Sequence, residues 1–75
     1  MKTRDLRKAL RNLGCSPVRQ KGSHEVWECP SGRKLPPLVT NQREASRCVV
    51  MHIMRVLRDE GLSEGKGWDA LASDA

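Results

Sequence analysis

The feature that most constrains the fold is a change in hydrophobic period along the chain. Residues 15–39 form short alternating runs that are separated by glycine and proline. Residues 42–60 have a helical period with one broad apolar face. The first segment, residues 3–13, is also helical, and its apolar stripe comprises Leu6, Ala9, Leu10 and Leu13. The chain therefore has to combine a small sheet with flanking helices.

The middle segment predicts three short strands joined by turns. Residues 15–20 and 24–29 flank a glycine-containing turn, which is typical of a hairpin. Residues 34–39 follow a second turn and form the third strand. Pro36 and Pro37 have no N–H to donate, so this strand can only lie at an edge of the sheet. We expect a three-stranded antiparallel meander.

The second predicted helix begins near residue 42. Asn41 is its expected N-cap, and Glu44 three residues later completes a capping-box pattern. Gly61 is expected to end the helix. His52 lies on its apolar face, so we expect a core or near-core histidine rather than a ligand. Trp27, on the second strand, is the expected large anchor of an otherwise aliphatic core.

These elements predict an α+β fold in the order α-β-β-β-α. One face of a three-stranded sheet has to be covered, and two amphipathic helices on that face can cover it. This is the architecture of domains that bind double-stranded RNA. We expect one domain over residues 1–62, followed by an acidic and flexible tail over residues 63–75. Trp68 and Leu71 of that tail could dock as a short turn on this chain or on a neighbour.

Charge is distributed unevenly along the chain. The sequence has 14 Lys and Arg against 9 Asp and Glu, for a formal net charge of +5 at pH 7. Residues 1–58 hold 13 basic and 4 acidic side chains, whereas residues 59–75 hold 1 basic and 5 acidic ones. A compact basic unit is typical of proteins that bind a polyanion, most often a nucleic acid. A merely soluble basic domain also fits this pattern.

The three cysteines, Cys15, Cys29 and Cys48, show no paired spacing. We interpret them as reduced thiols of a cytoplasmic protein. A zinc site that combines some of them with His24 and His52 is a weaker alternative, because zinc ligands normally come in closely spaced pairs. We therefore expect no metal and no cofactor. The apolar runs are too short to span a bilayer and no signal peptide is recognisable, so we expect no membrane partner.

One segment, residues 19–24, concentrates the groups that a phosphodiester site needs. Arg19 and Lys21 supply positive charge for phosphate oxygens. Gly22 lets the backbone approach a ligand closely, and its N–H and that of Ser23 can donate to an oxyanion. His24 can exchange a proton at neutral pH. Because the 2′-hydroxyl of RNA is an internal nucleophile, one imidazole with nearby cations can cleave RNA without a metal. An ordinary surface histidine after a turn also fits.

The same segment resembles the HicA family of small toxins, the ribonuclease halves of HicA–HicB toxin–antitoxin pairs. The strongest run of the family is an arginine, Gly-Ser-His, an aromatic residue and a proline. In this chain, these residues are Arg19, Gly22, Ser23, His24, Trp27 and Pro30. The opening helix and the stretch 56–62 match as well, so the resemblance covers about residues 1–62.

The resemblance implies a metal-independent endoribonuclease that cleaves mRNA, with His24 as its catalytic histidine. The family role carries over to His24 alone, and phosphate binding by Arg19, Lys21, Gly22 and Ser23 is expected from their chemistry. It also implies a HicB-type antitoxin that binds the toxin and blocks this site. The chain departs from the family at residues 35–40, which contain no histidine where many members have a second one. Two alternatives therefore stay open: an RNA-binding module without turnover, and an inactive toxin relic that still binds an antitoxin.

Overall fold

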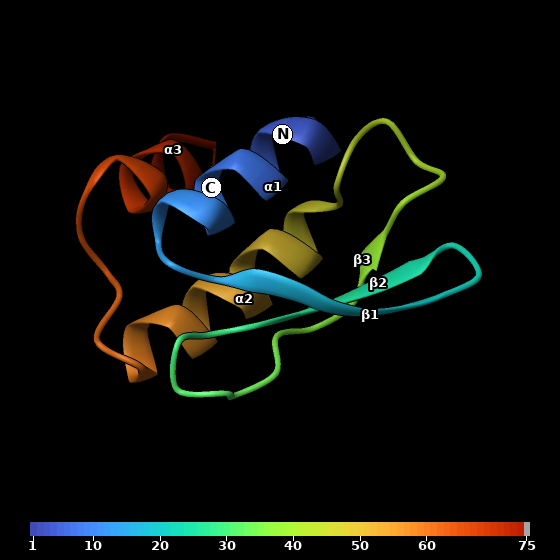
Figure 1. Ribbon diagram of the computed structural model, residues 1–75. Helices are drawn as coiled ribbons and strands as arrows, with labels where there is room; N and C mark the ends of the chain where they lie inside the picture. The colour runs from blue at the N-terminus through green and yellow to red at the C-terminus, as the bar shows by residue number, and fades with distance from the viewer. Residues whose placement is uncertain (75) are drawn as a thin grey trace.

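The computed structural model describes residues 1–74 and has a three-stranded sheet with three helices (Figure 1). The elements in chain order are α1 (Thr3–Asn12), β1 (Ser16–Lys21), β2 (His24–Glu28), β3 (Leu38–Val39), α2 (Arg47–Asp59) and α3 (Lys66–Asp74). The predicted α+β class and the order α-β-β-β-α are confirmed. The prediction of two helices is wrong, because a third helix follows α2.

Helix α1 buries the stripe that its sequence period predicts. Leu6 and Leu10 are fully buried, and Ala9 lies between them at 2% exposure. Arg4, Lys8 and Arg11 of this helix are exposed, whereas Arg7 is half-buried. The helix ends at Leu13, and Gly14 then adopts a φ of +84°, which turns the chain toward β1.

The sheet is antiparallel in the order β1-β2-β3, which makes β2 the central strand. Lys21 pairs with His24 and Arg19 pairs with Val26, with a register irregularity between Pro17 and Arg19. Every residue of β1 is exposed, whereas β2 carries the fully buried Trp27. The predicted core position of Trp27 is therefore confirmed.

The third strand is shorter than predicted. Pairing with β2 starts at Lys34, which bridges Glu28, and the N–H of Leu35 donates to the carbonyl of Trp27 at 2.9 Å. It is interrupted at Pro36 and Pro37, since neither proline has an N–H. It resumes as β3, where Val39 pairs with His24. The prolines thus divide the expected strand into an isolated bridge and a two-residue edge strand.

Helix α2 begins at Arg47, later than the capping-box pattern predicts. Its N-cap is Ser46, whose Oγ accepts a hydrogen bond from the N–H of Val49 at 3.2 Å. The predicted cap residues, Asn41 and Glu44, lie in the preceding loop instead.

Tertiary hydrogen bonds hold that loop in a non-helical path. The N–H of Thr3 donates to the carbonyl of Arg43, and the N–H of Ala45 donates to the carbonyl of Met1, both at 2.9 Å. The backbone groups that a longer helix would use are therefore paired with the start of α1.

The buried stripe of α2 comprises Val50, Ile53, Met54 and Leu57. His52 lies outside this stripe and is exposed, so the prediction of a core or near-core histidine is wrong. The predicted face contains His52, Ile53 and Leu57, and the buried stripe shares Ile53 and Leu57 with it but turns toward Val50 and Met54. Of these two overlapping stripes, packing selects the one that leaves His52 outside.

Helix α3 occupies residues 66–74, in place of the expected flexible tail. Leu71 is fully buried, and Gly67 packs so closely on α1 that a Cβ there would collide with the carbonyl oxygen of Ala9. The small, acidic residues of this segment predict a solvated tail. The prediction fails because a local sequence pattern does not show that one leucine, Leu71, packs into a core formed by distant segments.

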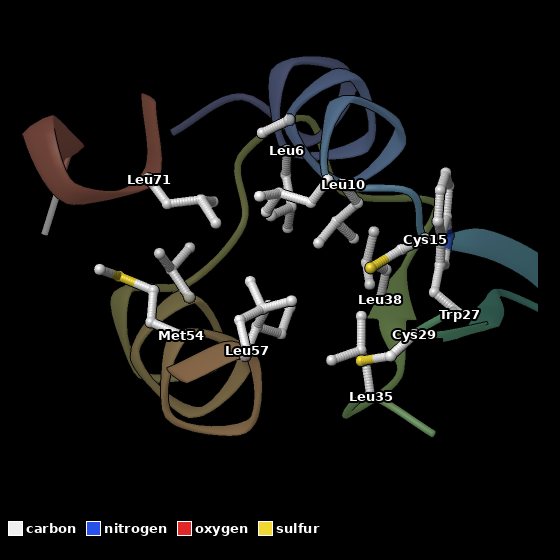
Figure 2. Packing of buried hydrophobic residues seen from close by; sticks show 14 residues of the cluster. Leu6, Leu10, Cys15, Trp27, Cys29, Leu35, Leu38, Met54, Leu57 and Leu71 are labelled. Atoms are coloured by element: carbon white, nitrogen blue, oxygen red, sulfur yellow. The ribbon is translucent and has the colours of Figure 1, made fainter. Parts of the chain in front are cut away.

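The core lies between the sheet and the three helices (Figure 2). Leu71 of α3 points toward Leu6 of α1, while Met54 and Leu57 of α2 close the layer from the other side. Trp27 joins this cluster from the central strand. The core therefore rigidly supports β2, the strand whose first residue is His24.

Candidate nucleic-acid interface at the hairpin of β1 and β2

The turn between β1 and β2 consists of Gly22 and Ser23. Gly22 has a φ of +59°, and Ser23 does not have a positive φ. A glycine at the first central position of a two-residue turn is typical of a type II′ hairpin, whose twist matches that of the strands. The glycine is therefore required by backbone geometry, independently of any ligand.

The turn places the predicted site residues around one surface hollow. His24 is exposed at the start of β2, and Lys21 lies directly opposite on β1. Arg19 pairs with Val26 two positions further along the ladder. The hollow is lined by Arg19, Lys21, Gly22, Ser23, His24 and Val26. All five residues predicted for the site thus lie together, while their chemical roles remain a prediction.

The hollow lies on the face of the sheet that the helices leave open. Side chains alternate between the two faces of a strand, and directly opposed residues share a face. Trp27 and Glu25 of β2 point toward α1, so His24 and Val26 point the opposite way. The imidazole is therefore accessible to a polymer that lies across the open face.

Thr40, just after β3, holds the turn from the other side. Its N–H and its Oγ1 both donate to the carbonyl oxygen of Ser23, at 2.6 and 3.0 Å. The same strand places Val39 beside His24. The sequence pattern missed Thr40, because its contact with Ser23 depends on how β3 pairs and no local motif indicates it.

Hydrogen bonds and a cation–π contact hold β2 against α1, on the face of the sheet that the helices cover. The Glu25 carboxylate accepts hydrogen bonds from Nε of Arg7 at 3.0 Å and from Nε1 of Trp27 at 2.7 Å. The Arg11 guanidinium lies over the Trp27 ring, 5.3 Å from its centroid. The network gives the strand that bears His24 a fixed position, and it uses residues that do not touch the hollow.

The groups around the hollow suit a phosphodiester. Two cationic side chains, Arg19 and Lys21, flank an exposed imidazole, and backbone N–H groups in a glycine turn can approach anionic oxygens. An imidazole is a side chain that can serve as a general acid or base toward a bound phosphodiester. The arrangement can therefore bind a phosphate and move one proton beside it.

The cysteines and His52 do not join this site. Burial raises the pKa of the Cys15 thiol to about 12 and also raises the pKa of the Cys29 thiol, so both stay protonated at neutral pH. Cys48 and His52 lie on the outer side of α2. Within residues 1–74, no three His, Cys, Asp or Glu side chains are arranged to hold a metal ion.

No helix in that part of the chain could cross a bilayer.

A family match identifies what this chain is related to. Residues 3–59, which are most of the chain, match the family described as HicA toxin of bacterial toxin-antitoxin. The chain belongs to the HicA toxin family. Members of this family are in general mRNA interferases, and membership implies an antitoxin partner. Searches of curated proteins and of solved structures return no match. The HicA match includes the whole hairpin and ends with α2, so α3 lies outside it.

Proposed function

We propose that this HicA protein is a metal-independent endoribonuclease that cleaves mRNA, with His24 as the general acid/base. The observation that carries the proposal is an exposed imidazole with Lys21 directly opposite and Arg19 in the same hollow. Family membership supports RNA as the substrate. A HicB-type antitoxin that covers this hollow is the proposed inhibitor.

The proposed reaction uses the RNA's own nucleophile. His24 accepts the proton of a 2′-hydroxyl, and the 2′-oxygen forms a bond to the adjacent phosphorus. The bond from phosphorus to the 5′-oxygen breaks, and that oxygen takes the proton from the His24 imidazolium, which returns the imidazole to its starting form. The products are a 2′,3′-cyclic phosphate and a free 5′-hydroxyl, so no oxidant, metal or cofactor is consumed. Arg19 and Lys21 stabilise the extra negative charge on the phosphoryl oxygens.

The test compares His24→Ala with His52→Ala, which removes the other histidine of the chain. With RNA and EDTA, His24→Ala should lose about 10²–10⁴-fold in cleavage rate, the usual contribution of general acid–base catalysis. His52→Ala, an exposed change outside the hollow, should cleave like the parent. Thermal unfolding should give unchanged midpoints for both. Cleavage by His24→Ala at the parental rate would refute the assignment.

The chemistry has its own control. A single 2′-deoxy substitution at the cleaved nucleotide should abolish scission there, because it removes the nucleophile. The new 5′ ends should be hydroxyls that a kinase can label without prior dephosphorylation. Ends that carry a 5′-phosphate would contradict attack by the 2′-oxygen.

A second candidate function is RNA binding without turnover. It is favoured by the stretch from Leu35 to Thr40, which contains no histidine where many family members have a second one. RNA binding without new 5′ ends would favour this candidate. Tight antitoxin binding without salt-dependent RNA affinity would instead identify an inactive relic.

A further inference from the structure

A second basic hollow lies at the start of α1. Its lining comes from α1 and from the loop between β3 and α2, and it includes Lys2, Arg4, Arg7, Thr40 and Arg43. Figure 1 shows this loop between the tip of the β1–β2 hairpin and the beginning of α1. The hollow is separate from the one around His24, and neither the sequence pattern nor the family match assigns it a role.

The two hollows meet at Thr40. Thr40 lines the second hollow, and both of its donors bind the carbonyl oxygen of Ser23, which lines the first. The residue before it, Val39, is the strand partner of His24. A chain that leaves the His24 hollow and passes over the end of the sheet at Thr40 therefore comes to the second hollow next.

Three cations of the second hollow are available to a ligand. Within residues 1–74, neither Lys2 nor Arg43 has a carboxylate oxygen within 4.0 Å. Arg4 lies 3.9 Å from Asp5, and both side chains are well exposed, so this pair contributes little. Arg7 differs, because its charge is matched by Glu25. The hollow thus has an excess of positive charge.

The backbone that carries these cations is held in place. The Oγ1 of Thr3 donates to the carbonyl oxygen of Gln42 at 2.7 Å. The N–H of the same residue donates to the carbonyl oxygen of Arg43. The loop is therefore tied to α1 on the same side as its cations. A preformed arrangement of this kind loses little conformational entropy when an anion binds.

The lining favours a nucleic acid over a protein partner. All of its side chains are charged, hydroxyl or amide groups, and no aliphatic or aromatic residue contributes. Protein interfaces have apolar cores that are depleted in charge, whereas phosphates are bound by arginine, lysine, threonine and glutamine. We propose that the second hollow is a phosphate-binding subsite for the RNA strand that His24 cleaves, holding nucleotides beyond the cleaved bond. This inference rests on the proposed function.

The test uses two double variants with the same loss of charge. Arg4→Ala/Arg43→Ala removes two cations of the second hollow. Arg47→Ala/Arg55→Ala removes two arginines that lie on the outer side of α2. Both are measured in the His24→Ala background, where RNA is bound but not cut. The first should weaken binding of a long single-stranded RNA at least about tenfold. It should also reduce the slope of log affinity against log salt by about 1, while the control changes neither.

A kinetic measurement separates the subsite from the catalytic hollow. With His24 present, Arg4→Ala/Arg43→Ala should raise KM for a long RNA with little change in kcat. A dinucleotide substrate, which fills only the His24 hollow, should show an unchanged KM. Equal effects of the two double variants on long RNA, or an equal rise in KM for the dinucleotide, would overturn the subsite. An antitoxin-binding defect with normal RNA affinity would overturn it as well.

The outcomes also distinguish the two proposals. If the parent cuts no RNA but only Arg4→Ala/Arg43→Ala weakens RNA binding, the catalytic proposal fails, and the second hollow stands as a phosphate-binding site for RNA that is bound but not cut. If the parent cuts RNA and the double variant binds and cuts normally, the subsite fails and the catalytic proposal stands.

Discussion

The hairpin end and the helical end of this molecule use their residues differently. All six residues of β1 are exposed. In the turn that follows, Gly22 is exposed and Ser23 is half-buried. At the other end, α1, α2 and α3 bury leucines in a shared core. The candidate site thus lies where few side chains are buried, and the buried core residues lie outside the hollow. Changes at the two ends should therefore separate activity from stability.

The largest effect is expected from a change at the helical end. Leu71→Ala removes a fully buried side chain of α3, and it should lower the free energy of unfolding by about 2–5 kcal/mol. Urea denaturation monitored by circular dichroism measures the change. Ala72→Ser, an exposed change on the same helix, should cost less than about 0.5 kcal/mol. Equal midpoints for Leu71→Ala and the parent would show that α3 is not part of the core.

An intermediate effect is expected at the hairpin turn. Gly22→Ala places a side chain at a φ of +59°, which should destabilise the protein by about 1–2 kcal/mol. Because the turn places His24 opposite Lys21, the variant should also lose RNA cleavage. A residual activity equal to the parent's would mean that the turn does not position the site.

Gly32→Ala is the matched control for that change. Gly32 has a φ of +93°, and a Cβ at either glycine would meet nothing within 4 Å. Both variants should therefore lose similar stability, but only Gly22→Ala should lose activity beyond the fraction that unfolds. This comparison separates backbone strain from its effect on the hollow.

The smallest expected effect is a pH dependence of the free energy of unfolding, and it comes from Cys15, which lies between α1 and β1. Burial raises the pKa of Cys15 from its reference value of 9.0 to about 12. A raised folded-state pKa contributes stability that is fully present below pH 9 and is lost as pH rises toward 12, because the unfolded thiol ionises first. Between pH 9 and 10, stability should fall by about 1 kcal/mol through this group.

Cys15→Ala should reduce that slope in urea midpoints measured between pH 8 and 10, while the contribution of Cys29, whose pKa burial also raises, should remain. Cys48→Ala, which removes an exposed thiol, should keep the parental slope. A slope for Cys15→Ala that matches the parent would assign the alkaline loss of stability to other groups.

Local features of the chain were predicted correctly because their causes are local. Gly22 follows from the two-residue turn, and the apolar spacing of α1 matches the residues that it buries. The clustering of Arg19 with His24 follows from the same hairpin, since a two-residue turn sets the pairing of the strands. These predictions needed no knowledge of distant segments.

The incorrect predictions concern segments whose structure depends on distant partners. The start of α2 moved to Arg47 because the loop before it bonds to the first residues of the chain. His52 lies outside the core because packing selected one of two possible stripes. Thr40 was missed as a support of the turn for the same reason, since its partner Ser23 lies 17 positions away.

The sequence alone determined the first helix, the β1–β2 hairpin and the cluster of cations around His24, because periodicity and turn chemistry act over a few residues. The tertiary structure decided that residues 66–74 form a packed helix and that Thr40 joins the two basic hollows. The physical reason is that burial and hydrogen bonding between distant segments release free energy only once the whole chain has folded.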